Sequence, residues 1–195
     1  MKLRRGFKTE ANAYAREFRA ELGLAPYDPL CPWMLAQHLE ITVTPLTYFI
    51  EIPDAVRCLT GQERQRFSAV TVFRGSRRSI VYNDAHHRHR QTSSIAHEIS
   101  HGILGHPPTA PLNEYGCRYY DKAIEDEANW LGPALLISEE AALYIVSTKM
   151  TMTEAIITYG VSEDIITMRI NVTGAQRRLE RKYTRSSIFN KNWIF

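Results

Sequence analysis

Apolar residues recur every three or four positions along most of this chain, the spacing that places them on one face of a helix. The ranges with this pattern are 9–22, a short segment that begins at Pro32, 91–104, 122–136 and most of the C-terminal part. Three shorter ranges, 41–43, 67–73 and 79–83, alternate between apolar and other side chains, as strands do. A turn at Gly75 and Ser76 joins the last two, which predicts an antiparallel hairpin. The order of elements therefore predicts an α+β fold in which a small antiparallel sheet is followed by helices.

One pentapeptide in the predicted helix 91–104 has the spacing of a metal site. In His97-Glu98-Ile99-Ser100-His101 the two histidines lie about one helical turn apart, so both imidazoles can reach one cation. Glu98 lies beside that cation without being forced to bind it, so it can take a proton from a water that the metal activates. An ordinary amphipathic helix with two histidines on one face is the alternative. We predict His97 and His101 as zinc ligands and Glu98 as the catalytic base.

A catalytic zinc ion needs a third protein ligand and one open position. The candidates are Glu125 and Glu127, both in the predicted helix 122–136. We favour Glu125 because Asn129 lies one turn later on the same face, where its amide oxygen can accept a hydrogen bond from a ligand imidazole. A solvated charge on the helix surface is the alternative for either residue. The apolar residues that share the face of Glu125 are Ala128, Leu131, Leu135 and Leu136.

Length and composition limit the class of protein. The 195 residues, 44% of them hydrophobic, suit a single domain over 1–195. The His-Glu-x-x-His pattern, which is typical of metallopeptidases, assigns a metallopeptidase core to 25–137 and leaves a helical part at 138–195. The net charge of +3 does not require a nucleic-acid partner. Charged residues follow the basic N-terminus where a signal peptide has an apolar run, and no stretch reaches the ~20 apolar residues of a membrane span. With three widely spaced cysteines, these features predict a cytoplasmic protein.

Two further segments are candidate binding sites. Residues 153–171 resemble a helix-turn-helix, with Gly160 at the turn and Ser162 as an N-cap. The second helix would open with Glu163 and Asp164, where a helix that reads a DNA groove presents donors, so we predict packing or partner contact and no direct DNA binding.

The basic segment 86–90 is rich in histidine, but neighbouring side chains point apart. It is interpreted as a solvated turn before the metal helix.

Several motifs together resemble the ImmA/IrrE metallopeptidases. They lie at residues 80–83, 90–98, 125–129 and 135–136. In that family a strand leads into an Ala-His-Glu helix, and a later Glu-x-Glu-Ala-Asn helix ends in a leucine pair. The resemblance covers about residues 30–170. It implies a minimal thermolysin-like zincin fold in which His97, His101 and Glu125 hold zinc. The chain departs from the family pattern at Trp130-Leu131-Gly132-Pro133 and at Ile137-Ser138, which makes the substrate groove less predictable.

The resemblance also implies a substrate class. Family members include intracellular proteases that cleave a helix-turn-helix repressor and so derepress phage, mobile-element or stress genes. The resulting hypothesis is a gluzincin-like zinc endopeptidase with such a repressor as its protein substrate. The alternative is a DNA-binding transcriptional regulator that uses the metal fold as a scaffold or sensor. A donor for the oxyanion is also expected, and the sequence does not choose among its candidates, His106, Tyr115, Arg118, Tyr119 and Tyr120.

Overall fold

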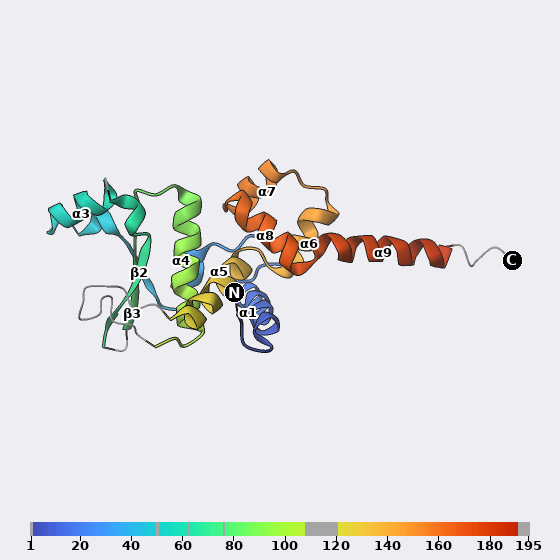
Figure 1. Cartoon of the computed structure of the whole chain (residues 1–195), viewed down its shortest axis with the longest axis horizontal. Coiled ribbons are helices and arrows are strands. Elements are labelled where there is room, and N and C mark those ends of the chain that lie inside the picture. The colour runs from blue at the N-terminus through green and yellow to red at the C-terminus, as the bar shows by residue number, and fades with distance from the viewer. Residues whose placement is uncertain (1, 50, 62, 76, 108–120, 191–195) are drawn as a thin grey trace.

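The computed structural model describes residues 2–49, 51–61, 63–75, 77–107 and 121–190. Figure 1 shows a small sheet beside α4 on one side of the molecule and a group of C-terminal helices on the other, with α9 projecting outward. The elements in chain order are α1 (Phe7–Glu21), α2 (Pro32–His38), β1 (Thr42–Pro45), η1 (Leu46–Tyr48), α3 (Pro53–Thr60), η2 (Arg64–Arg66), β2 (Ala69–Arg74), β3 (Arg77–Tyr82), α4 (Arg88–Ile103), α5 (Lys122–Leu136), α6 (Glu139–Ser147), α7 (Met152–Tyr159), α8 (Glu163–Thr173) and α9 (Ala175–Asn190).

The sheet has the order β1-β3-β2 and is mixed. β2 and β3 form the predicted antiparallel hairpin, whose turn residue Ser76 lies outside the described residues. β1, however, runs parallel to β3, with Thr42 opposite Ser79. The prediction of a wholly antiparallel sheet was therefore wrong. Pro45 at the end of β1 and Ala69 at the start of β2 both pair with Tyr82. The connection through α3 therefore begins and ends at the same end of the sheet. β2 then runs back, and β3 returns in the direction of β1.

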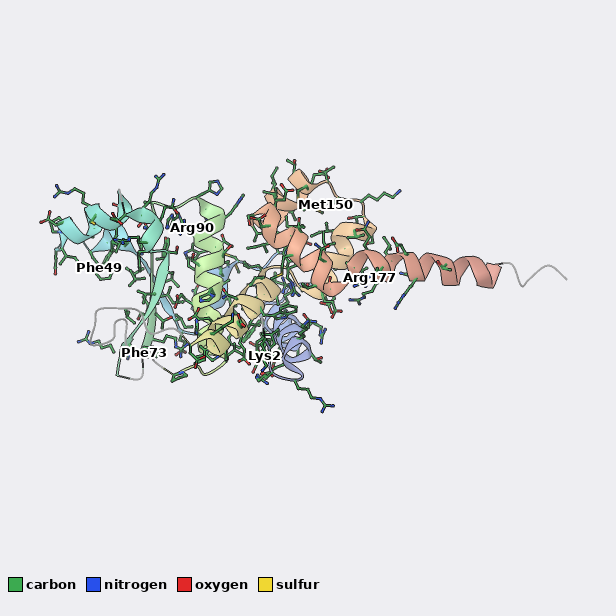
Figure 2. The ribbon with its side chains drawn as sticks, in the orientation of Figure 1. Lys2, Phe49, Phe73, Arg90, Met150 and Arg177 are labelled. Carbon is green, nitrogen blue, oxygen red and sulfur yellow. The ribbon has the colours of Figure 1, made fainter. Side chains whose placement is uncertain are left out.

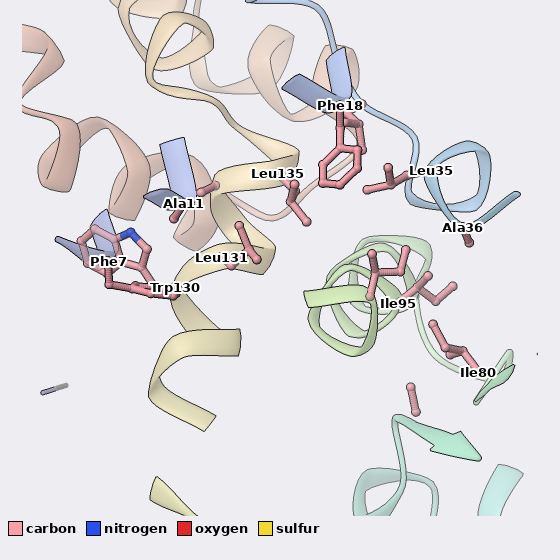
Figure 3. Packing of buried hydrophobic residues seen from close by; sticks show 14 residues of the cluster. Phe7, Ala11, Phe18, Leu35, Ala36, Ile80, Ile95, Trp130, Leu131 and Leu135 are labelled. Carbon is pink, nitrogen blue, oxygen red and sulfur yellow. The ribbon is translucent and has the colours of Figure 1, made fainter. Parts of the chain in front are cut away.

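A first hydrophobic core joins α1, α4, α5 and the sheet. Ile80 of β3, Ile95 of α4, and Leu131 and Leu135 of α5 are all fully buried in it. Figure 3 shows Ile95 facing Ile80 on one side, while Leu131 and Leu135 come from the neighbouring helix. α4 therefore packs between the sheet and α5. Side chains at the borders of its buried face are close to both of these elements.

A second hydrophobic core joins the C-terminal helices to the same pair of central helices. Ala155 of α7 and Ile166 of α8 are fully buried in it, together with Ala96 of α4 and Leu136 of α5. α7 ends at Gly160, which has a φ of 62°, and α8 begins three residues later, so the segment consists of two helices joined by a short turn. The apolar face of this segment packs inward against the central helices.

Two fully buried arginines stabilise the C-terminal end of α5. The Nη2 of Arg19 donates to the carbonyl oxygen of Leu136 at 3.1 Å. The Nε of Arg169 donates to the carbonyl oxygen of Ile137 at 2.8 Å. The last carbonyl groups of a helix have no partner within the helix, so these bonds satisfy acceptors that burial would leave unpaired. Burial lowers the pKa of each guanidinium to about 10, which leaves both charged at neutral pH.

The start of α4 differs from the sequence prediction. The helix begins at Arg88 rather than at residue 91, and the Nδ1 of His87 accepts the capping bond from the backbone N–H of His89. His86 is buried, and its Nε2 lies 2.9 Å from the carbonyl oxygen of Phe67. The interpretation of 86–90 as a solvated turn was therefore wrong for its buried first residue and for the part that joins the helix. Among the helices that the structure describes, none combines the length and apolar character needed to cross a membrane.

Candidate metal centre

Two imidazoles of α4 converge on the side where α5 crosses it. The Nε2 atoms of His97 and His101 lie 3.1 Å apart. Ile95 and Ile99 on other positions of the same helix are fully buried in the first core, and their burial fixes the rotation of α4. The i, i+4 spacing then places both rings on one face, as the sequence predicted.

Glu125 of α5 completes the group of donor atoms. Its Oε2 lies 3.3 Å from the Nε2 of His97, and its Oε1 lies 3.7 Å from the Nε2 of His101. A tetrahedral ion with bonds of about 2.0–2.2 Å separates its ligand atoms by roughly 3.3–3.6 Å. The distances in the structure are close to these values. One atom from each residue lies within 4.8 Å of the others, so the three residues could hold a metal ion, and their nitrogen and oxygen donors suit zinc.

Gly132 explains how α5 comes so close to the metal helix. A Cβ at this position would lie 3.2 Å from the backbone nitrogen of His97 and 3.3 Å from its Cα. Backbone atoms cannot move aside as a flexible side chain can, so any larger residue would push the helices apart. This glycine lies in the Trp130-Leu131-Gly132-Pro133 segment that departs from the family pattern, and it lets Glu125 reach the imidazoles two turns away.

Glu98 lies next to the donor group and, within the described residues, is not part of it. Its Oε2 accepts a hydrogen bond from the Oγ1 of Thr71 on β2 at 2.6 Å. Glu98 also lines a cavity of about 330 Å³ together with His97 and Asn129. The hydrogen bond from Thr71 therefore orients the Glu98 carboxylate, while the cavity leaves room for a solvent molecule beside it. The sequence did not identify Thr71, because no local pattern indicates which residue of a strand will face a helix.

Glu127 and His106 lie on the other side of the site. The Nδ1 of His106 is 2.9 Å from the Nδ1 of His101, and its Nε2 is 3.5 Å from the Oε2 of Glu127. Glu127 is thus directed away from the three donor atoms, as predicted. His106 is occupied on both ring nitrogens, which argues against its role as an oxyanion donor. The other candidates for that role, Tyr115, Arg118, Tyr119 and Tyr120, lie outside the described residues.

The hydrogen bond expected from Asn129 is not among those of the described residues. Asn129 is exposed, and the described residues include no hydrogen bond between its amide and a ligand imidazole. The partner of the His101 ring is His106 instead. A sequence signal for this contact does exist, since His106 follows Gly105 directly after the metal helix, and a glycine in that place predicts a turn that folds the next residue back.

Burial keeps the imidazole of His101 neutral. Loss of solvent, reinforced by the neighbouring His97, lowers the pKa of His101 to about 4. Burial also lowers the pKa of His106, against the opposing effect of Glu127. A neutral imidazole is the form that binds a cation, so the protein environment favours the ligating state at neutral pH.

Comparison with known proteins agrees with this geometry. The model of the IrrE N-terminal-like domain, peptidase family M78, matches residues 58–171 of the chain, a range that includes α4, α5 and the helix-turn-helix segment. The chain belongs to this family of ImmA/IrrE metallopeptidases. No curated protein and no solved structure matched the sequence.

Proposed function

We propose that the chain is a zinc-dependent endopeptidase in which His97, His101 and Glu125 bind the metal. The observation that carries this proposal is the triangle of 3.1, 3.3 and 3.7 Å between their donor atoms, with Glu98 adjacent to it but outside it. Two histidines and one glutamate form the ligand set of thermolysin, which leaves a fourth position open. We therefore assign the site to the thermolysin-like, gluzincin type.

Glu98 is the proposed general base and acid. A bound zinc ion would supply the positive charge that polarises the peptide carbonyl and acidifies a nearby water. Glu98 takes the proton of the water whose oxygen attacks the carbonyl carbon, and delivers it to the nitrogen as the C–N bond breaks. The products are a carboxylate and an amine. The hydrogen bond from Thr71 holds the Glu98 carboxylate in place for both transfers.

An extended substrate fits the surroundings of Glu98. β2 is an edge strand that pairs only with β3 among the described strands, and Thr71 of this strand contacts Glu98. The outer edge of such a strand can bind a peptide through backbone hydrogen bonds. The segment to be cleaved must therefore be flexible or locally unfolded, because only an extended backbone can lie along the edge.

The proposed substrate is a helix-turn-helix repressor, the class that the ImmA/IrrE resemblance implies. Selectivity would then come from docking on the C-terminal helices, which are mixed in charge and separate in sequence from the metal ligands. The exposed Ile157 of α7 and Val172 of α8 offer apolar contacts for such a partner. The cytoplasmic location remains a prediction from the sequence.

The alternative of a DNA-binding regulator finds less support. Glu163 and Asp164 at the first turn of α8 are exposed and acidic, where phosphate or base contacts would need donors. Absence of direct DNA binding stays a prediction.

The test first identifies a helix-turn-helix repressor encoded next to this protein, which is the expected substrate. It then incubates the protein with zinc and that repressor and maps the fragments by mass spectrometry. We expect a single cut that requires both the metal and Glu98, with unstructured casein largely spared. Free degradation of casein would contradict selection by docking. An uncut repressor, together with a shift of operator DNA in a gel, would favour the regulator instead.

A further inference from the structure

The turn that ends α4 brings His106 onto the ligand His101. The backbone N–H of Gly105 donates to the carbonyl oxygen of Gly102 at 3.1 Å, and that of His106 donates to the carbonyl oxygen of His101 at 3.0 Å. Gly105 has a φ of 63°, the left-handed conformation that this pair of bonds requires. Such a turn is a Schellman motif, in which the residue after the glycine contacts the side chain five positions earlier. The spacing His-x-x-x-Gly-His therefore encodes the contact between the two imidazoles.

The direction of the hydrogen bonds follows from the role of His101. If its Nε2 binds the metal, its Nδ1 carries the proton and donates to the Nδ1 of His106 at 2.9 Å. The Nε2 of His106 then carries a proton and faces the Oε2 of Glu127 at 3.5 Å. Each ring has a single tautomer that satisfies both of its neighbours. The imidazole of His106 is 8% exposed, so water does not readily replace either contact.

The far end of this chain of contacts is fixed by the N-terminal segment. The Nε of Arg4 lies 3.0 Å from the Oε1 of Glu127, and Arg4 also pairs with Glu10 at 2.6 Å. The backbone N–H of Lys2 donates to the carboxylate of Asp126 at 2.9 Å. Figure 2 shows Lys2 where the N-terminal segment meets α5. Residues 2–10 therefore hold the outer face of the same helix whose inner face presents Glu125.

The two ligand histidines differ in this respect. Within the described residues, the Nδ1 of His97 has no hydrogen-bond partner, whereas that of His101 has His106. We propose that His106 is a positioning residue that fixes the tautomer and ring orientation of His101, and that Glu127 acts through it. This inference rests on the proposed zinc site, in which His101 is a ligand.

The first test measures zinc affinity by competition with a chelator for His106→Leu and His106→Gln. Loss of a partner of a ligand imidazole weakens metal binding about 10–100-fold. We expect a loss in this range for His106→Leu and substantial rescue in His106→Gln, whose amide can both accept and donate. In the cobalt-substituted protein, His106→Leu should also shift the visible absorption bands, which report the geometry of the ligands.

His86→Leu is the matched control. His86 is also buried and hydrogen-bonded to a carbonyl oxygen, but it lies before α4 and away from the ligands. Its loss should leave the zinc affinity and the cobalt spectrum unchanged. Wild-type affinity in a folded His106→Leu variant, with zinc lost in His101→Ala, would overturn the positioning role while leaving the metal site intact. Full zinc binding by His101→Ala would instead refute the ligand set itself.

A double-mutant cycle tests the order of the contacts without relying on His106→Leu alone. If Glu127 acts through His106, then Glu127→Gln weakens zinc binding in the wild-type background but not in a protein that already carries His106→Leu. Equal losses in both backgrounds would mean that Glu127 influences the metal independently, and the proposed chain of contacts would be wrong.

Discussion

The half of the chain around the first core and the half around the second differ in what their polar side chains do. In the first, His97, His101 and Glu125 converge on one point although each is partly accessible. In the second, the principal buried polar group is Arg169, which donates to the main chain at the end of α5. The first half thus gathers polar groups at one site and also supplies Arg19, which donates to the end of α5 as Arg169 of the second half does.

The C-terminal helices pack directly against the two helices that carry the candidate metal ligands. Arg19 and Arg169 are 150 positions apart in the sequence, yet they donate to the consecutive carbonyl groups of Leu136 and Ile137 at the C-terminal end of α5. The second core also includes Ala96, next to His97, and Leu136. The position of the ligand helix therefore depends on packing from both halves.

The largest expected effect distinguishes the two acidic residues of the ligand helix. Glu125→Ala should weaken zinc binding by more than about 100-fold, since it removes a ligand, whereas Glu127→Ala should cost about 10-fold because it removes only an outer contact. Titration of both variants against a competing chelator measures the difference. Equal losses, or a larger one for Glu127, would reverse the assignment.

Arg169→Met tests the supporting half. The substitution leaves the buried carbonyl group of Ile137 without this donor, so the free energy of unfolding should fall by about 1–3 kcal/mol. Arg178→Met is the control, because Arg178 pairs with Glu139 at the surface and should contribute at most about 1 kcal/mol. Urea denaturation of both variants gives the values. A greater loss for Arg178 would show that the buried contact is not what stabilises α5.

A smaller effect is expected at the crossing of α4 and α5. Overpacking by Gly132→Ala costs about 1–3 kcal/mol, and the gain in helix propensity returns about 1 kcal/mol. We therefore expect net destabilisation of about 1 kcal/mol and weaker zinc binding, since Glu125 is moved away from His97. Calorimetry with and without zinc measures both. A more stable variant with unchanged affinity would mean that the helices separate without disturbing the ligands.

The smallest effect is expected on the exposed face of α7. Ile157 is 75% exposed, so Ile157→Asp should change the free energy of unfolding by no more than about 0.5 kcal/mol and leave zinc binding unchanged. If this face docks the substrate, cleavage of the repressor should nevertheless slow. A normal rate of cleavage would place the docking surface elsewhere.

Much of this arrangement could be predicted from the sequence because its signals are local. The 122–136 helix agrees in both bounds with α5, and helix 9–22 differs from α1 by two residues at one end and one at the other. Spacing on α4 pointed to His97 and His101, and a shared face on α5 pointed to Glu125; the structure brings donor atoms of all three together.

The rest depended on contacts between distant segments. Nothing in residues 41–43 indicates which strand they will pair with, so the parallel pairing of β1 was missed. Thr71 and Arg169 gain their roles from residues 27 and 32 positions away. The role of His106 was different, since the glycine before it is a local signal, and its contact with His101 could have been predicted from the turn that this glycine forms.

The central claim is that Glu98 lies beside the metal rather than bound to it, and Glu98→Gln tests this most directly. Elemental analysis of the purified variant, with His97→Ala as the negative control, should find one zinc per chain in Glu98→Gln and none in His97→Ala. The repressor assay should find cleavage reduced by about 10²–10⁴ in Glu98→Gln, because the base is missing, and no cleavage by the zinc-free His97→Ala variant. Loss of zinc from Glu98→Gln, or retained cleavage in the zinc-loaded variant, would contradict the account.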